Sequence, residues 1–202
     1  MIALTFDDGP GRFTGMILDT LAEYGGLATF CVLGYRVEGW AQVAQRIVAD
    51  GHELTGHSWA HTNMTTQTRD QVTAAIIDTD AAIYAVTGVR PTLFRPPYGE
   101  FNAQVVEIAA ELGQGILMWS IDPRDWDMRN RSAEDLYRDI MRQARDGAII
   151  VLHDIFLTTA QAMEWVIPSL VEQGFALVTA SELIYHFYGG VEPGQVFRGT
   201  LW

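Results

Sequence analysis

The sequence predicts an α/β protein that is built on a parallel β-sheet. Short apolar runs of strand type alternate along the chain with longer runs that have a helical period. The helical runs stop at glycines, among them Gly25, Gly88, Gly113 and Gly174, as helix ends commonly do. The chain has 202 residues, of which 49% are hydrophobic, and this suits one domain with a substantial core. We therefore expect a single domain over residues 1–202.

Seven stretches have the apolar, often β-branched composition of buried strands. They are Ile2–Phe6, Leu27–Leu33, His52–Thr55, Thr92–Phe94, Gly115–Ile121, Ala148–Leu152 and Phe175–Val178. Strands that are separated by helices normally pair in parallel. The pattern fits an open, doubly wound sheet and equally a closed or nearly closed barrel.

Seven runs carry apolar residues three or four positions apart and predict helices. They contain residues 17–21, 40–47, 72–86, 105–112, 136–141, 163–170 and 183–187. Asn102 and Ser132 stand in front of two of these runs and are expected N-caps. The Gly-rich tail over residues 189–202 is expected to lie on the surface.

Charge and composition exclude several classes of partner. The net charge is −12, and all 13 basic residues are arginines that form no cluster, so we expect no nucleic-acid binding. No apolar stretch is long enough to span a membrane, and the start of the chain does not resemble a signal peptide. The single cysteine, Cys31, lies in an apolar run and is expected to be a buried hydrophobic residue. Nothing in the sequence requires more than a monomer.

Groups that titrate or bind metals follow five of the predicted strands. The segments are DDGP (7–10), HSWAH (57–61), RPPYG (95–99), DPRDW (122–126) and HD (153–154). In parallel α/β folds the ligand binds at the carboxyl ends of the strands. The five segments therefore predict one functional rim.

His57 and His61 are candidate metal ligands because residues four apart share a face of one helical turn. A strand-end carboxylate supplies a third ligand, and such a set leaves positions open for water and substrate. Ser58 stands where a HExxH metalloprotease would have its glutamate, so that class is excluded. A non-haem iron oxygenase uses similar ligands, but we expect such a site on an all-β scaffold. Hydrolysis assisted by a Lewis-acid metal fits better.

The pair Asp7-Asp8 closes the first predicted strand. Consecutive strand residues point in opposite directions. One aspartate can therefore ligate the metal while the other acts as a base on the bound water. Gly9 and Pro10 then turn the chain sharply away.

Three further rim residues are candidates for proton transfer. His153 follows an apolar run and suits a general acid. Asp125 is a candidate to orient its imidazole, and Arg95 is a candidate partner that lowers the pKa of the base.

Taken together, TFDDGP (5–10), HSWAH (57–61), RPPYG (95–99), DPRDW (122–126) and VLHD (151–154) resemble the five ordered motifs of the polysaccharide deacetylases. This is carbohydrate esterase family 4, the nodulation-protein-B homology domain. The resemblance implies a distorted (β/α) barrel with about seven parallel strands. It also implies that Asp8, His57 and His61 bind Zn²⁺ or another divalent ion such as Co²⁺.

The same resemblance implies roles for the remaining site residues. Asp7 would be the catalytic base, held by Arg95, and His153 the general acid, tuned by Asp125. The backbone N–H of Tyr98 would contribute to the oxyanion hole. The acetyl group would be bound by Tyr98, Trp126 and Leu152.

The implied activity is removal of N-acetyl groups from N-acetylglucosamine units of a glycan, either peptidoglycan or a chitin-type oligosaccharide. Three alternatives stay open: an acetylxylan esterase with the same site, an inactive carbohydrate-binding module, and an amidohydrolase of small molecules. The family's usual location implies an extracellular or cell-envelope protein. Because the chain starts directly in a strand, we expect a trimmed catalytic domain.

Overall fold

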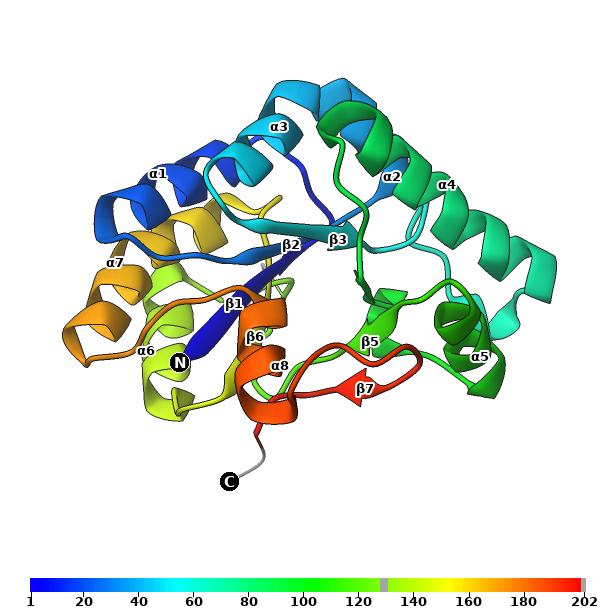
Figure 1. Ribbon diagram of the computed structural model, residues 1–202. Helices are drawn as coiled ribbons and strands as arrows, with labels where there is room; N and C mark the ends of the chain where they lie inside the picture. Colours follow the sequence, from blue (N-terminus) through cyan, green and yellow to red (C-terminus); the bar gives the residue numbers. More distant parts are fainter. Residues whose placement is uncertain (128–130, 201–202) are drawn as a thin grey trace.

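The computed structural model describes residues 1–127 and 131–200. The described residues form one parallel sheet of seven strands in the order β6-β1-β2-β3-β4-β5-β7. The strands are β1 (Ile2–Asp7), β2 (Thr29–Val32), β3 (Glu53–Gly56), β4 (Leu93–Phe94), β5 (Gly115–Leu117), β6 (Ala148–His153) and β7 (Val196–Phe197). Figure 1 shows this sheet curled, with helices around its outside.

The segment after β5 brings the open side of the curled sheet back to β6. The backbone N–H groups of Ser120 and Ile121 donate to the carbonyl of Ile149, and the N–H of Val151 donates to the carbonyl of Ile121. Ile121 and Ile150 form a parallel bridge. The predicted distorted barrel of seven parallel strands is therefore confirmed.

All seven predicted helices are present in the described chain. They are α1 (Thr14–Tyr24), α3 (Ala41–Ala49), α4 (Arg69–Thr87), α5 (Ala103–Glu111), α6 (Ala133–Gln143), α7 (Leu157–Glu172) and α8 (Ala180–Tyr188). One further short helix, α2 (Gly34–Val37), was not predicted. Three 3-10 turns of the described chain lie in the connections between these elements: η1 (Glu38–Trp40), η2 (Met64–Thr66) and η3 (Pro97–Gly99). Asn102 and Ser132 cap α5 and α6 as predicted, because each side chain accepts a backbone hydrogen bond from the first turn. None of the helices in the described ranges is long and apolar enough to cross a membrane.

The seventh strand is not where the sequence predicted it. Within the predicted stretch Phe175–Val178, Leu177 makes only an isolated bridge to Ile2. The place beside β5 is taken by β7, which belongs to the tail that was expected to lie on the surface. The reason is packing: the ring of Phe197 is fully buried in a cluster that includes Leu117. Residues 201 and 202 of that tail lie outside the described residues.

Strand alternation places polar groups at one end of the barrel interior. In β1, Ala3, Thr5 and Asp7 share one face, and β6 pairs with them in register up to Asp7 opposite His153. Ala3 belongs to an apolar cluster with residues of α8, which lies beside β1 near the N-terminus (Figure 1). The interior therefore changes from apolar at the α8 end to acidic and basic at the carboxyl ends of the strands.

A half-buried carboxyl group outside this rim, that of Asp80, joins α4 to the start of β5. The side-chain amide of Gln114 donates a 2.7 Å hydrogen bond to Asp80 Oδ2. Burial raises the pKa of Asp80 to about 7, although the hydrogen bond from Gln114 opposes that change. Asp80 therefore retains its proton in the folded chain at pH values where an unfolded chain would lose it.

This raised pKa predicts a pH-dependent effect of Asp80→Asn on stability. The neutral carboxyl of Asp80 stabilises the fold fully below the unfolded pKa, and that contribution is lost as the pH rises through about 7. The asparagine variant does not lose it, so its melting temperature relative to the parent is expected to increase between pH 4 and pH 7 and then level off. Calorimetry of the metal-free proteins checks this, with the exposed neighbour Asp78→Asn as control. A difference that does not change with pH would contradict it.

Candidate active site

A pocket of about 460 Å³ opens at the carboxyl ends of the strands. Predicted site residues from all five motifs line it: Asp7, Asp8, His57, His61, Tyr98, Trp126 and His153. Arg95 and Asp125 are buried directly behind this wall. The structure thus brings together the rim that the sequence predicted.

The side chains of Asp8, His57 and His61 form a group that could hold a metal ion. Their ligand atoms all lie within 4.8 Å of one another, with His57 Nε2 3.7 Å and His61 Nε2 3.5 Å from Asp8 Oδ1. The prediction that the two histidines share one helical turn is wrong. They lie in a loop after β3, where His61 has a φ of 54° and its N–H donates to Ser58 Oγ. The loop, rather than helix periodicity, brings the rings together.

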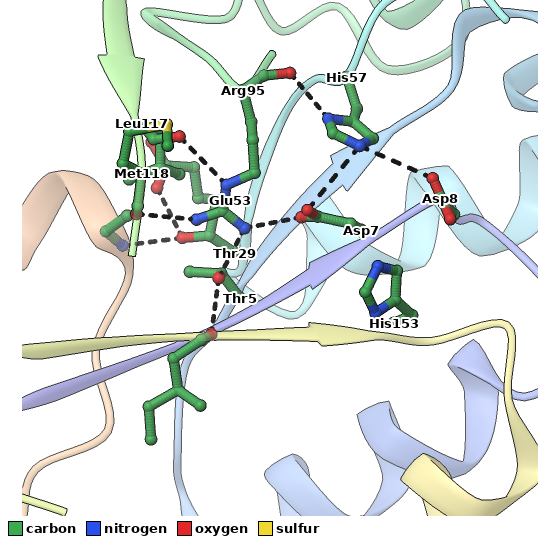
Figure 2. A network of polar contacts seen from close by, with 12 residues as sticks. Thr5, Asp7, Asp8, Thr29, Glu53, His57, Arg95, Leu117, Met118 and His153 are labelled. Atoms are coloured by element: carbon green, nitrogen blue, oxygen red, sulfur yellow. Dashed lines mark hydrogen bonds and ion pairs between the residues drawn. The ribbon is translucent and has the colours of Figure 1, made fainter. Parts of the chain in front are cut away.

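The tautomer of His57 is fixed by the chain itself. Its Nδ1 lies 2.7 Å from the backbone carbonyl of Arg95, and a carbonyl can only accept, so Nδ1 carries the proton. Nε2 then presents its lone pair toward Asp8, as Figure 2 shows. Burial lowers the pKa of His57 and of His61, which favours the neutral form that binds metals.

Asp8 Oδ1 has the surroundings of a cation ligand. This atom is buried, and the described residues offer it no hydrogen-bond donor, although it faces two imidazole nitrogens. Burial raises the pKa of Asp8, since the charge it would carry is desolvated. A buried carboxylate oxygen without a partner is costly unless a cation or a donor satisfies it. One carboxylate and two neutral imidazoles therefore fit a divalent ion.

Asp7 is paired with a fully buried arginine. Arg95 Nη1 donates to Asp7 Oδ1 at 2.7 Å and to Thr5 Oγ1 at 2.8 Å, while Nε and Nη2 donate to the carbonyls of Leu117 and Met118 (Figure 2). Burial alone raises the pKa of Asp7, but the charge and hydrogen bond of Arg95 together with the charges of His57 and His153 outweigh it, and the pKa lies below the usual aspartate value. Asp7 is consequently an unprotonated acceptor inside the pocket.

His153 is held by Asp125 through two contacts. Asp125 Oδ1 lies 2.7 Å from His153 Nδ1, and Asp125 Oδ2 accepts the backbone N–H of the same histidine. Burial lowers the pKa of His153, but the hydrogen bond and charge of Asp125, with Asp7 and Asp8 nearby, raise it to about 9. In the metal-free protein the imidazole is therefore protonated at neutral pH, and Nε2 is the nitrogen left for the pocket.

One predicted lining residue is misplaced. Leu152 is 0% exposed and packs in the core under the helices, whereas its neighbour Val151 lines the pocket. The cause is the two-residue period of β6, which puts Val151 on the same face as His153 and Leu152 on the other. Trp126 is 47% exposed at the pocket wall, as expected of a residue that meets a ligand.

Tyr98 adopts a backbone conformation that a non-glycine residue seldom takes. Its φ is 61°, inside the η3 turn, and its ring lies 4.4 Å from that of His61. Such left-handed residues cost free energy and tend to occur at functional sites.

Sequence reasoning missed several residues that support the site. Thr159 Oγ1 donates to Asp125 Oδ2 at 2.7 Å, and Thr5 Oγ1 accepts from Arg95. Asp122, Trp119 and Phe156 line the pocket. Thr5 could have been found because it shares a strand face with Asp7, but no sequence signal marks Thr159.

Comparison with known proteins agrees with this geometry. A model of the polysaccharide deacetylase family matches residues 1–116. The chain is 41% identical to the peptidoglycan-N-acetylmuramic acid deacetylase PdaC of Bacillus subtilis and 42% identical to the peptidoglycan-N-acetylglucosamine deacetylase PgdA of Listeria monocytogenes. These matches cover 91% and 90% of this chain but only 38% of either relative, so the chain spans well under half of their length.

A solved structure of similar extent also superposes closely. The family 4 acetyl xylan esterase of Clostridium thermocellum, in complex with cobalt, has a TM-score of 0.90 and 32% identity, with 100% of this chain and 99% of that chain covered. The family model, the relatives and the superposed structure agree with the five ordered motifs and with the barrel. This chain therefore belongs to the polysaccharide deacetylase family.

Proposed function

We propose that this chain is the catalytic domain of a metal-dependent deacetylase that removes N-acetyl groups from N-acetylglucosamine units of peptidoglycan or a chitin-type glycan. One observation carries the proposal. The unprotonated Asp7 and the protonated His153 stand opposite each other in paired strands, beside a group of three residues that could hold a metal. Relatives named as peptidoglycan and chitin deacetylases support the substrate class.

Asp8, His57 and His61 would hold the ion, for which Zn²⁺ or Co²⁺ suits the donor set. When bound, the ion would act as a Lewis acid on the acetyl carbonyl and lower the pKa of water. The remaining chemistry belongs to the side chains. Asp7 removes a proton from the water whose oxygen attacks the carbonyl carbon. Its pair with Arg95 keeps the carboxylate aimed into the pocket.

His153 completes the reaction from β6, the strand that pairs with β1. Its Nε2 proton passes to the amide nitrogen as the carbon–nitrogen bond breaks, so acetate and a free amine leave. Asp125 holds the ring in place and stabilises its charge. We assign stabilisation of the carbonyl oxygen to the backbone N–H of Tyr98, a contribution worth roughly 3 kcal/mol for one such donor. Trp126 and Val151 would enclose the acetyl methyl group.

A second candidate is hydrolysis of O-acetyl groups on xylan, which the likeness to the acetyl xylan esterase favours. Ester and amide hydrolysis pass through the same kind of tetrahedral intermediate, so this site serves either. We further propose that the domain acts in the cell envelope or outside the cell, as the peptidoglycan-directed relatives suggest, and that it acts as a monomer, since nothing in the sequence requires more.

Metal removal provides the direct test of this function. Acetate release from an N-acetylglucosamine oligomer is expected to stop after treatment with a chelator and to return when Zn²⁺ or Co²⁺ is added. Acetylated xylan, assayed in parallel, separates the two candidate substrates. Release that continues unchanged in metal-depleted protein would refute the metal-dependent mechanism. A protein that holds the metal and releases acetate from neither polymer nor from peptidoglycan would refute the proposed deacetylation and leave the binding module and the small-molecule amidohydrolase as candidates.

A further inference from the structure

The turn Asp8–Gly11, which follows β1, is fixed by three contacts. The N–H of Leu33 donates to the carbonyl of Gly9, and Arg36 Nε donates to the carbonyl of Pro10, each at 3.0 Å. The third contact comes from Thr14, the first residue of α1, whose hydroxyl accepts the N–H of Gly11 at 2.8 Å. The first two contacts come from the segment after β2, whereas the third connects the turn to the start of α1.

Thr14 is in turn held by a buried acid that the mechanism does not use. Its hydroxyl donates to Asp154 Oδ2 at 2.5 Å, and both side chains are 0% exposed. Asp154 also packs directly against Gly9, where an added Cβ would lie 2.7 Å from Asp154 Cγ and closer still to its oxygens. In the described part of the chain, Asp154 Oδ1 has no hydrogen-bond partner. A buried acid with one unsatisfied oxygen is costly and calls for an explanation.

The location of this acid supplies the explanation. Asp154 directly follows His153, and the turn that it supports, Asp8–Gly11, directly follows Asp7. Asp8 has a φ of 70°, so the aim of its carboxylate depends on how the turn beyond it is held. Thr14 and Asp154 thereby connect the end of β6 to the end of β1 behind the site.

We propose that Thr14 and Asp154 act together as positioning residues that hold the turn Asp8–Gly11, and with it the metal-binding carboxylate of Asp8, in place. The proposal rests on the proposed function, because it takes Asp8 as a metal ligand. Groups that orient metal ligands typically change metal affinity or activity by about 10- to 100-fold when they are lost.

The test compares two threonines of the same helix. Thr14→Val is expected to weaken Zn²⁺ binding, measured by titration calorimetry without glycan, by about tenfold or more. Thr20→Val is the matched control, because Thr20 donates only to the carbonyl of Met16 within α1. Thr14→Ser keeps the hydroxyl and is expected to retain the parent's affinity. Melting temperatures of the metal-free proteins report the structural cost of each change.

A second comparison keeps the proposal testable if one variant folds poorly. Asp154→Ala removes the acceptor of the Thr14 hydroxyl and is expected to weaken Zn²⁺ binding, and adding it to Thr14→Val is expected to bring little further loss, since the two residues act as a unit. Zn²⁺ affinity of Thr14→Val within twofold of the parent, failure of Thr14→Ser to retain affinity, or additive losses in the double variant would each overturn the proposal. A parent chain that bound no Zn²⁺ would instead refute the proposed function, and this inference with it.

Discussion

Asp7→Asn is expected to lower the turnover number by a factor of roughly 10² to 10⁴ while Zn²⁺ stays bound. The amide of asparagine cannot accept the proton that the attacking water must lose. The metal-binding group of Asp8, His57 and His61 does not include Asp7, so its donors remain. The amide oxygen can still accept from Arg95, which limits the cost to stability. Steady-state kinetics with acetate detection, together with the zinc content of each preparation, checks both halves of the expectation.

Asp8→Asn is the comparison that separates the two adjacent carboxylates. It removes a charged ligand, so both bound Zn²⁺ and activity are expected to fall, whereas Asp7→Asn loses only activity. Normal turnover in zinc-loaded Asp7→Asn would show that Asp7 is not the base. Loss of zinc from Asp7→Asn, with zinc retained in Asp8→Asn, would show that the two roles are reversed.

The sequence could predict this division of labour but not the geometry that produces it. Two carboxylates at a strand end indicated one ligand and one base, and the family resemblance indicated which was which. Strand alternation puts Thr5 and Asp7 on one face, but the sequence could not show that Asp7 lies opposite His153 or that Asp8 takes a left-handed conformation. Both facts depend on strand register and on the turn, which are set by tertiary contacts.

The helical period gave a wrong prediction for residues 57–61, because this segment has no regular secondary structure. The spacing of His57 and His61 was interpreted as a helical turn, yet a loop with positive φ at Ser58 and His61 brings the same rings together. The prediction of Leu152 as a pocket residue is wrong for a different reason. Strand alternation from His153 places Val151, and not Leu152, on the face that lines the pocket. That correction was available from the sequence alone.

The barrel was predictable because apolar alternation of strands and helices is a strong pattern over a whole chain. The seventh strand was not, since β7 is only two residues long and lies in a Gly-rich tail. Its place is decided by the burial of Phe197 beside Leu117, a contact between segments far apart in sequence. Short edge strands of this kind depend on tertiary packing more than on local propensity.

Arg95→Met is expected to have the largest effect on stability of any single change considered for this chain. Arg95 is 0% exposed, and its loss leaves the buried carboxylate of Asp7 without its cation and the carbonyls of Leu117 and Met118 without donors. Breaking a buried ion pair by removing one partner typically costs about 3–5 kcal/mol. Denaturant unfolding of the metal-free protein at pH 7 measures the free energy of unfolding, with Arg46→Met as control. Arg46 pairs with Asp19 and Asp50 on the surface, where such pairs contribute less than about 1 kcal/mol.

The sign of the pH dependence distinguishes this explanation from simple loss of packing. In the parent, Arg95 depresses the pKa of Asp7, so the pair stabilises the fold above the unfolded pKa of aspartate and this contribution is lost as the pH falls. In Arg95→Met, burial is opposed by His57 and His153 but no longer by Arg95, so the pKa of Asp7 rises and the variant recovers stability as Asp7 takes up a proton. The stability difference between parent and variant is therefore expected to be large at pH 7 and to narrow toward pH 4. A difference that stays constant over this range would mean that Arg95 contributes volume to the core and not charge to the base. In that case Asp7 would need another explanation for its unprotonated state, and the acid limb of the pH–rate profile would be unchanged in Arg95→Met.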